Sequence, residues 1–397
     1  MDSATSLAGS AVQATNLSKA TYIKFLSAND SGATGAHQSG ILLSVKACPM
    51  IFGAIPREHV AKRNGIKVTW QDDLTTLSTF TWYESKNELR LTRLGRGFPY
   101  LNPDVTGALF VFCQVEDGEY LAYILNTDDE IEEYLTAFSL GPQDANLMFT
   151  PKSVDTVEVA EELAIRTYVE YLGVAGGADW PRSEMVSREA RDIQRDVNRK
   201  ARLQLTNPDL QIIEYTRVEY AIFREIETQA YGSRLSQGFD SIEDFVILAN
   251  TVLNRRKSRA GKSFEHHLAS LFRANDLPFE EQVKTEGNKK PDFVFPSGEA
   301  YHDISYPVER LVVLGAKTTC KDRWRQVINE ADRIRDRTKY LVTLQQGISP
   351  QQLSEMQDEN VQLIVPKPYI KSFPKEYQPD IWSLKTFIEH VRRTLND

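Results

Sequence analysis

Three charged side chains near the C-terminal end of the sequence have types and spacing that suit phosphodiester chemistry. Asp292 opens an apolar run, Phe293-Val294-Phe295, which reads as a short buried strand that ends in a Pro-Ser-Gly turn. Lys317 ends a second apolar run, and helical spacing over residues 322–337 predicts a helix that carries Glu330. Two adjacent strands can present Asp292 and Lys317 side by side, and the helix can bring Glu330 in from the side.

Carboxylates that converge beside a lysine are what magnesium-dependent cleavage of a phosphodiester requires. Mg²⁺ prefers oxygen ligands, keeps several waters and uses one or two carboxylates. It holds the scissile phosphate and lowers the pKa of a bound water, which the lysine can orient. Taken alone, a Pro-Asp pair and a distant lysine also fit a surface turn and a solvated lysine. The coherent strand, strand and helix pattern favours the metal site.

Three long sequence segments in this half of the chain resemble the corresponding segments of the EcoRII-type restriction endonucleases, which belong to the PD-(D/E)xK nuclease superfamily. They are NRRKSRAGKSFEHHL, TEGNKKPDF and AKTTCKDRWRQ. The acid that usually stands two residues before the lysine is absent, and Gly315 takes its place. The resemblance implies that this acid has moved to the next helix, where Glu330 fits. It also implies a further catalytic and metal-binding carboxylate on the helix before the first strand, at Glu265.

Composition sets limits on the class of protein. The 397 residues suffice for two domains with separate cores, and the three cysteines are far apart, which favours a reducing cytoplasm over a disulfide framework. We expect neither a secretory signal nor a membrane helix, because no apolar run approaches about 20 residues. The formal net charge is −8, but acid and base are segregated along the chain, so DNA can still bind in specific clefts.

The N-terminal half is a series of short β-prone runs separated by turn residues, which predicts an antiparallel sheet or barrel. Residues 1–18 are rich in Ser, Ala and Thr, and we expect them to be poorly ordered. Residues 176–181 form the predicted linker region between an N-terminal domain, 1–175, and a C-terminal domain, 182–397. The C-terminal domain opens with helices and continues with the strands of a mixed sheet.

Two sequence segments resemble the effector domain of the same family, a pseudobarrel that binds a second copy of the target DNA. They are SANDSGATGAHQSG and KNELRLTRLGRG. Cationic and amide side chains there can contact phosphates and base edges. The alternative is a basic strand edge that keeps the sheet soluble. The candidate effector-DNA residues are His37, Lys86, Asn87, Glu88, Arg90 and Arg93.

Further residues of the C-terminal half are candidates for contact with target DNA. Asp322 and Arg323 suit a C·G step, since Arg donates bidentately to guanine and Asp accepts from cytosine, although Asp322 also fits a helix N-cap. The resemblance places Arg217 and Tyr220 where the family sandwiches a flipped base pair, and a core tyrosine is the alternative. The run NRRKSRAGK is expected to be a loop that follows the DNA backbone, with a solvated helix end as the alternative. It supplies Asn254, Arg255, Arg256, Lys257 and Arg259.

The sequence therefore predicts an α+β protein of two domains, with an N-terminal β pseudobarrel that binds DNA and a C-terminal α/β restriction-endonuclease-like domain with a mixed central sheet. The predicted function is that of a type II (IIE) site-specific endonuclease. It cuts double-stranded DNA with Mg²⁺ at a short CCWGG-like site, leaves 5′-phosphates and is regulated by effector DNA. A near-palindromic target calls for a homodimer. The alternatives are a DNA-binding regulator with a decayed core and a methylation-directed nuclease.

Overall fold

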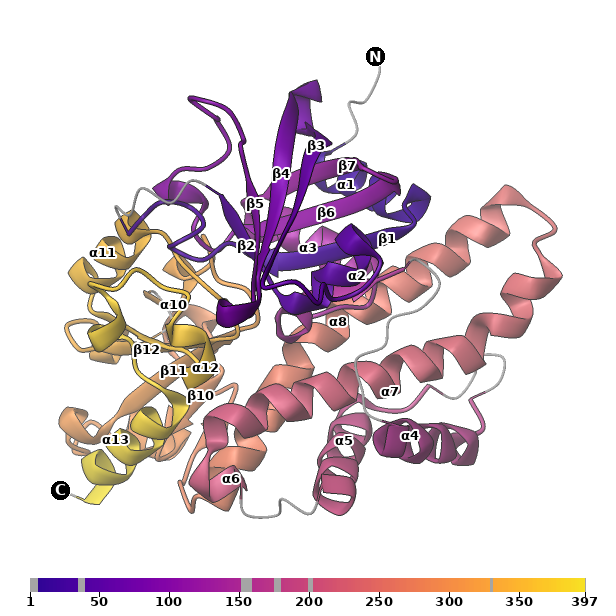
Figure 1. Cartoon of the computed structure of the whole chain (residues 1–397). Helices are drawn as coiled ribbons and strands as arrows, with labels where there is room; N and C mark the ends of the chain where they lie inside the picture. The colour runs from indigo at the N-terminus through magenta and orange to yellow at the C-terminus, as the bar shows by residue number, and fades with distance from the viewer. Residues whose placement is uncertain are drawn as a thin grey trace.

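The structure is a computed structural model, and it describes residues 6–34, 40–150, 159–174, 180–198, 203–328 and 331–396. It has two sheets, a curled one in the N-terminal half and a mixed one in the C-terminal half, with long helices beside and beneath them (Figure 1). This arrangement confirms the predicted fold class.

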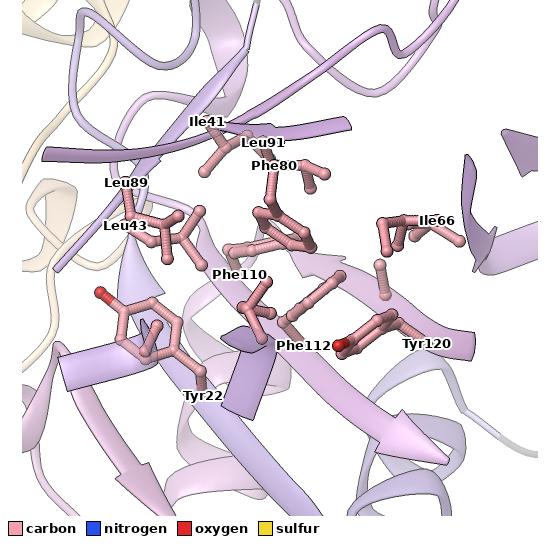
Figure 2. Close-up of a cluster of buried hydrophobic side chains, with 14 of the residues drawn as sticks. Tyr22, Ile41, Leu43, Ile66, Phe80, Leu89, Leu91, Phe110, Phe112 and Tyr120 are labelled. Atoms are coloured by element: carbon pink, nitrogen blue, oxygen red, sulfur yellow. The ribbon is translucent and has the colours of Figure 1, made fainter. Parts of the chain in front are cut away.

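The N-terminal sheet has eight strands in the order β2-β5-β4-β3-β7-β6-β1-β8, and its neighbours pair antiparallel except for the parallel pair β3–β7. The sheet curls around a core of aromatic and branched side chains that includes Phe80, Phe112 and Tyr120 (Figure 2). Alternate residues of each strand point into that core, which is why the β-prone runs were recognisable in the sequence. The strands are β1 Ala20–Phe25, β2 Ile41–Leu43, β3 Val60–Trp70, β4 Thr75–Tyr83, β5 Glu88–Thr92, β6 Leu109–Glu116, β7 Glu119–Leu125 and β8 Leu147–Phe149.

Two helices cover the outer face of this sheet, and one of them corrects the expectation of disorder over residues 1–18. Helix α1, Leu7–Leu17, is capped by Ser6 and buries Ala8, Ala11 and Ala14 in a second hydrophobic cluster. The small side chains that suggested disorder instead let the helix pack closely on the sheet. Helix α3, Asp128–Ala137, begins with a capping box between Thr127 and Glu130.

The C-terminal sheet has the order β13-β12-β11-β10-β9. Strands β10, β11 and β9 pair antiparallel, whereas β11, β12 and β13 run parallel, as expected for a mixed sheet. One face packs against three helices, α7 Pro208–Gln237, α8 Ile242–Ala274 and α13 Leu384–Asn396, and the other against α11 Pro350–Asp358. The strands are β9 Glu280–Glu281, β10 Phe293–Phe295, β11 Val312–Lys317, β12 Lys339–Thr343 and β13 Val361–Ile364.

Helix α4, Val159–Leu172, packs with the C-terminal helices rather than with the curled sheet. Ile165 and Val169 share a hydrophobic cluster with residues of α5, Ser183–Asn198, and of α7. The domain boundary at residue 175 stays a prediction, and residues 175–179 of the linker region lie outside the described residues. The smaller helices are α2 Cys48–Phe52, α6 Leu203–Thr206, α9 Gly298–His302, α10 Arg325–Ile328 and α12 Lys367–Ile370.

Two local predictions in the C-terminal half are wrong. The helix expected over 322–337 is instead α10, Arg325–Ile328, followed by a 3₁₀ turn at Asp332–Ile334. Trp324 belongs to the cluster with β13 and α11, whereas Ile334 belongs to a different cluster under α9, and one straight helix cannot supply both. The basic run that was expected to be a loop lies inside α8, because Arg, Lys and Ala propagate a helix and Gly261 alone does not end it.

The three cysteines are buried and form no disulfide. Among the described helices, none has the length and apolar character required to cross a bilayer.

Phe272 of α8 is the anchor of the C-terminal core, since its ring meets those of Phe279, Phe293, Phe295 and Phe387 at centroid distances of 5.2–6.1 Å. We predict that Phe272→Ala lowers the free energy of unfolding by about 3–5 kcal/mol, because the cavity cannot be refilled. Urea denaturation followed by circular dichroism measures this change. Leu77→Ala, at a side chain 71% exposed, is the control and should change stability by less than about 0.5 kcal/mol.

Candidate active site and nucleic-acid interface

The end of β11 and the start of β10 bring two of the predicted catalytic side chains together. The antiparallel register pairs Phe293 with Leu314, so Asp292, one residue earlier, falls opposite Gly315 and next to Ala316. The Ala316 amide donates to Asp292 Oδ2 at 2.7 Å, and Lys317 Nζ lies 3.6 Å from the same oxygen. Asp292 is largely buried, while the Lys317 side chain keeps partial access to solvent. A carboxylate and an ammonium therefore converge where β10 starts and β11 ends.

Gln282, which the sequence reasoning missed, joins Asp292 to Glu265. Its side-chain amide donates to Asp292 Oδ1 at 3.0 Å and to Glu265 Oε2 at 3.3 Å, and its φ of 56° is uncommon for a residue other than glycine. Glu265 also accepts from Lys262 at 3.1 Å. A left-handed residue next to a candidate site is a signal that only coordinates reveal.

The third predicted catalytic residue, Glu330, lies outside the described residues. Within the described ranges, no group of three or more His, Cys, Asp and Glu side chains is arranged to hold a metal ion. Asp292 and Glu265 are nevertheless hard oxygen donors linked through a single amide, and this chemistry fits a divalent cation.

The predicted base-reading pair, Asp322 and Arg323, contacts the N-terminal half of the same chain. Arg323 makes ion pairs with Asp129 and Glu132 of α3, at 2.7 and 2.5 Å. Asp322 Oδ1 accepts the Asp128 amide at 3.2 Å. Both side chains that were expected to read DNA are thus engaged by one acidic helix.

Asp128 fixes this contact through the main chain. Its Oδ2 accepts the backbone N–H groups of Lys321, Asp322 and Arg323 at 2.8, 2.8 and 3.0 Å. Although burial opposes its ionisation, the contact with the Asp322 carboxyl and these three amides hold the pKa of Asp128 below its usual value. Burial and the adjacent Asp128 raise the pKa of Asp322.

Lys321 is almost completely buried between the two halves. Its Nζ donates to Asn126 Oδ1 at 2.6 Å, to the Thr106 carbonyl at 2.9 Å and to the Asp104 carbonyl at 3.3 Å. Burial lowers the pKa of Lys321 to about 8. Close by, a Cβ on Gly107 would lie 1.9 Å from the Gly347 carbonyl oxygen, so the two halves meet too closely there for any side chain.

The cations of the basic run on α8 also have partners within the chain. Arg256 pairs with Glu227 at 2.7 Å and donates to the carbonyls of Thr136 and Ala137 at the end of α3. Lys257 lies 3.6 Å from Glu132 of α3. Arg255 stacks on Trp180 with its guanidinium carbon 4.4 Å from the ring centroid, and Asn254 is exposed.

Tyr220 and Arg217 of α7 lie in a buried setting. Arg259 covers the Tyr220 ring at 3.8 Å and the Phe223 ring at 4.2 Å. Arg217 is bidentate to Glu161 at 2.9 Å and also pairs with Glu214. A carboxylate of the N-terminal half, Asp144, is buried 3.9 Å from Arg224 in the same region, and the Ser139 carbonyl accepts from that arginine at 2.9 Å. The sandwich role of Tyr220 and Arg217 stays a prediction.

Five of the six predicted effector residues lie on β5 or just beyond one of its two ends. Lys86, Asn87 and Arg93 are exposed, and Asn87 and Arg93 adopt left-handed backbone conformations. Arg90 and Glu88 form an ion pair on β5. His37 lies outside the described residues. The roles of all six residues stay predictions.

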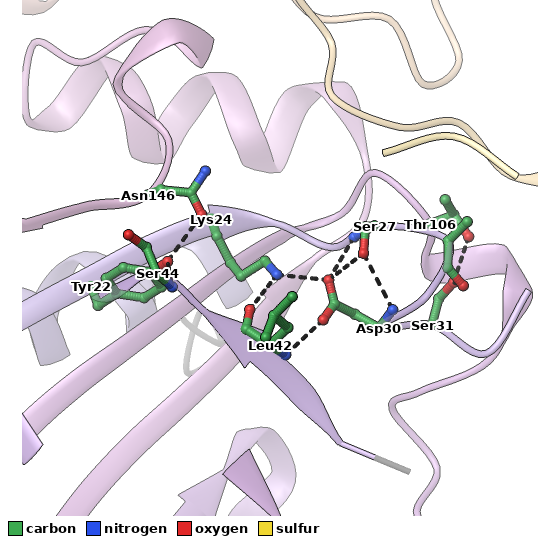
Figure 3. A network of polar contacts seen from close by, with 10 residues as sticks. Tyr22, Lys24, Ser27, Asp30, Ser31, Leu42, Ser44, Thr106 and Asn146 are labelled. Atoms are coloured by element: carbon green, nitrogen blue, oxygen red, sulfur yellow. Dashed lines mark hydrogen bonds and ion pairs between the residues drawn. The ribbon is translucent and has the colours of Figure 1, made fainter. Parts of the chain in front are cut away.

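The described segments on either side of residues 35–39 are joined by a buried network, drawn in Figure 3. Lys24 Nζ donates to Asp30 Oδ2 at 2.7 Å, and the Ser27 hydroxyl and amide donate to the same oxygen. Asp30 Oδ1 accepts the amide of Leu42 at 2.7 Å, which links the segment at Asp30 to β2.

Comparison with known proteins matches both halves. A model of the EcoRII C-terminal domain matches residues 223–388, and a model of the N-terminal domain of restriction endonuclease EcoRII matches residues 15–153. The chain is 36% identical over 396 residues, 93% of each protein, to the type II restriction enzyme EcoRII of Escherichia coli. The chain belongs to the EcoRII family of type II restriction endonucleases. It is therefore a site-specific deoxyribonuclease that cleaves DNA, and this class implies a divalent metal cofactor.

Other relatives cover only part of this chain. The type II restriction enzyme SsoII of Shigella sonnei is 29% identical over 142 residues, 32% of this chain and 46% of that protein. Among solved structures, metal-depleted Ecl18kI in complex with uncleaved, modified DNA aligns at 20% identity and TM-score 0.45, over 58% of this chain and 84% of that one. A PspGI–substrate DNA complex aligns at 19% identity and TM-score 0.44, over 54% and 93%.

Sequence reasoning also missed what the acidic run Asp128 to Glu133 does. It was visible as a charge cluster, but only the tertiary contacts show that three of its members meet Arg323, Lys257 and the amides of 321–323. The signal in the sequence is the opposite charge of two dense clusters, the acidic run Asp128 to Glu133 and the basic run Arg255 to Lys262, because opposite charges favour contact between the two runs.

Removing the Gln282 amide should loosen the link between Asp292 and Glu265. We predict that Gln282→Ala lowers the DNA cleavage rate by about 10–100-fold, as is usual for groups that orient metal-binding side chains. Initial rates on a plasmid substrate measure this. Gln357→Ala, on α11 and remote from the site, should cut at the unaltered rate. An unaltered rate for the Gln282 variant would show that the carboxylates are positioned without it.

Proposed function

We propose that the protein is a Mg²⁺-dependent endonuclease that hydrolyses both strands of duplex DNA at a short C/G-rich, CCWGG-like site. One observation carries the proposal, the convergence of Asp292, Lys317 and Glu265 where β10 starts and β11 ends. It acts as a homodimer in the bacterial cytoplasm, because a near-palindromic site calls for two symmetric cutting centres.

The residues have distinct roles in this reaction. Asp292 and Glu265, with Glu330, would hold Mg²⁺, which supplies charge neutralisation at the phosphate and a bound water of lowered pKa. Lys317 Nζ orients the attacking water. The water oxygen forms a bond to phosphorus, the bond from phosphorus to the 3′ oxygen breaks, and that oxygen leaves with a proton. The products are a 5′-phosphate and a 3′-hydroxyl.

Replacing Lys317 should separate this enzyme from a DNA-binding regulator. We predict that Lys317→Ala lowers cleavage by roughly 10²–10⁴-fold, as expected when a group that positions or moves a proton is lost. The measurement is digestion of methylated and unmethylated plasmids in Mg²⁺, with the fragment ends sequenced. Lys371→Ala, at an exposed lysine that follows α12, is the control and should cut normally.

The same experiment decides between the proposed site and its alternatives. Cuts confined to CCWGG-like sequences support the proposal, whereas cuts only on methylated plasmid favour a methylation-directed nuclease. If the Lys317 variant and the unmodified chain have equal activity, this site carries out no chemistry, and the protein acts here only as a DNA-binding protein.

The N-terminal half regulates cleavage by covering the residues that meet target DNA. Support comes from α3, whose acids engage Arg323 and Lys257, and from Asp128, which holds the main chain of 321–323. Asp144 and Ser139 contact Arg224 near Tyr220 in the same way. A second DNA copy binds the turn around Lys86, Asn87, Arg90 and Arg93, together with Glu88 and His37. That binding shifts the N-terminal half away from the cleft.

Charge removal on α3 tests this regulation. We predict that the double variant Asp129→Asn, Glu132→Gln raises cleavage of a DNA carrying one site, and reduces the stimulation by an added effector oligonucleotide, because Arg323 loses both of its acidic partners. Glu133→Gln is the matched control, since it lies on the same helix and contacts Ser6 instead. Equal rates for all three proteins would argue against coverage by α3.

A further inference from the structure

Lys262 of α8 is the last cation of the basic run, and it contacts a candidate metal ligand. Its Nζ donates to Glu265 Oε2 at 3.1 Å, three residues further along the same helix. The cations that precede it in the run contact other acids and aromatic rings of the chain. Lys262 therefore belongs to the candidate catalytic centre, although it is not among the residues predicted from the sequence.

The oxygen that Lys262 contacts is the one that connects the two candidate metal ligands. Glu265 Oε2 also accepts the Gln282 amide at 3.3 Å, and the same amide donates to Asp292 Oδ1 at 3.0 Å. Lys317 Nζ lies 3.6 Å from Asp292 Oδ2. The two carboxylates, joined by one amide, thus lie between two ammonium groups.

The acid of the Lys262–Glu265 pair is held in place, whereas the lysine can move. The Glu265 side chain is 16% exposed and that of Lys262 50%. Phe264 and Leu268, on either side of Glu265 in the sequence of α8, are buried in the C-terminal core and fix this stretch of the helix. Lysine carries its ammonium on a flexible four-carbon stem, so Lys262 can leave Glu265 without a change in the fold.

A divalent metal and the Lys262 ammonium require the same carboxylate oxygen. Hard divalent cations bind carboxylate oxygens directly, and Glu265 Oε2 is the oxygen through which Glu265 and Asp292 can share one cation. Each carboxylate oxygen has two lone-pair sites, and those of Oε2 are engaged by Lys262 and Gln282. Because two cations at such a distance also repel, the ammonium has to move before Oε2 can bind the metal.

We propose that Lys262 competes with the divalent metal for Glu265 in the DNA-free protein, and that a phosphate of the target DNA draws its ammonium away. The DNA backbone offers Lys262 a second anion beside the catalytic centre. Metal and DNA then assist each other's binding, because each removes a competitor of the other, and this coupling is reciprocal. The inference deepens the proposed function and rests on one part of it, that Glu265 is a metal ligand.

Metal affinity without DNA tests the first half of the proposal. The probe is Mn²⁺, titrated into the full chain, with the free ion measured by electron paramagnetic resonance. We predict that Lys262→Gln tightens Mn²⁺ binding by about two- to fivefold, the range expected when a half-exposed ion pair that opposes binding is removed. Lys262→Arg keeps the competing charge and should bind Mn²⁺ as the unmodified chain does. Lys385→Gln, at an exposed lysine of α13, controls for the change in net charge.

The salt dependence of DNA binding tests the second half. The probe is a fluorescent duplex that carries a CCWGG-like site, and its affinity is measured by anisotropy, without metal, at several salt concentrations. Lys262→Gln should make the fall of log affinity with log salt shallower by about one, because one phosphate contact is lost. Lys262→Arg and Lys385→Gln should keep the slope of the unmodified chain.

Glu265→Gln, titrated with Mn²⁺ alongside, separates a failure of this inference from a failure of the proposed function. If Glu265→Gln weakens Mn²⁺ binding while Lys262→Gln leaves it unchanged, Glu265 is a metal ligand and the competition by Lys262 is wrong. If Glu265→Gln leaves Mn²⁺ binding unchanged, the proposed metal site is wrong and the inference fails with it. An unaltered salt slope for Lys262→Gln would show that no phosphate draws this lysine away, which also overturns the proposal.

Discussion

The antiparallel register between β10 and β11 is the constraint on which the candidate catalytic centre depends. Pairing Phe293 with Leu314 puts Asp292 opposite Gly315, so Lys317, two residues further along β11, lies diagonal to Asp292 on the same face of the sheet. A slip of one residue would turn one of these side chains to the opposite face of the sheet. The ring of Phe272 packs on Phe293 and Phe295 of β10. This buried aromatic cluster holds β10 in that register, because a slip would remove both rings from the contact.

Helix α8 connects the candidate catalytic centre to the N-terminal half. It runs unbroken through the basic run at Arg255 to Lys257 and on to Glu265 beside Gln282. Because one helix carries both, the contact of the basic run with α3 involves the same element that presents Glu265.

The cations that suit a DNA backbone are satisfied by acids of the same chain in this structure. Arg323 and Lys257 meet the carboxylates of α3, and the amides of 321–323 meet Asp128. Carboxylates and phosphates make the same kind of charge-assisted hydrogen bond with arginine and with main-chain N–H groups, so under the proposed function DNA would compete with α3 for these donors. The negative net charge of the whole protein is compatible with this, since the local pairing decides the contact.

The sequence by itself determined much of this protein, and it did so where the signal is local. Short runs of apolar residues predicted the strands of both sheets, because the two-residue repeat of a strand can be recognised within a few consecutive residues. The polar residues that flank two apolar runs, Asp292 and Lys317, were recognisable as a pair that the fold brings together, and three sequence stretches around them identified the family. Tertiary structure alone decided the rest. The residues from Trp324 to Ile334 look like one helix, but they enter two different clusters and the helix breaks. The Ser- and Ala-rich start becomes a helix only because the outer face of the curled sheet receives it. Gln282 joins two carboxylates, and Asp128 finds three amides almost 200 positions away, through contacts that no local pattern records, since their energy depends on distances set by the whole fold.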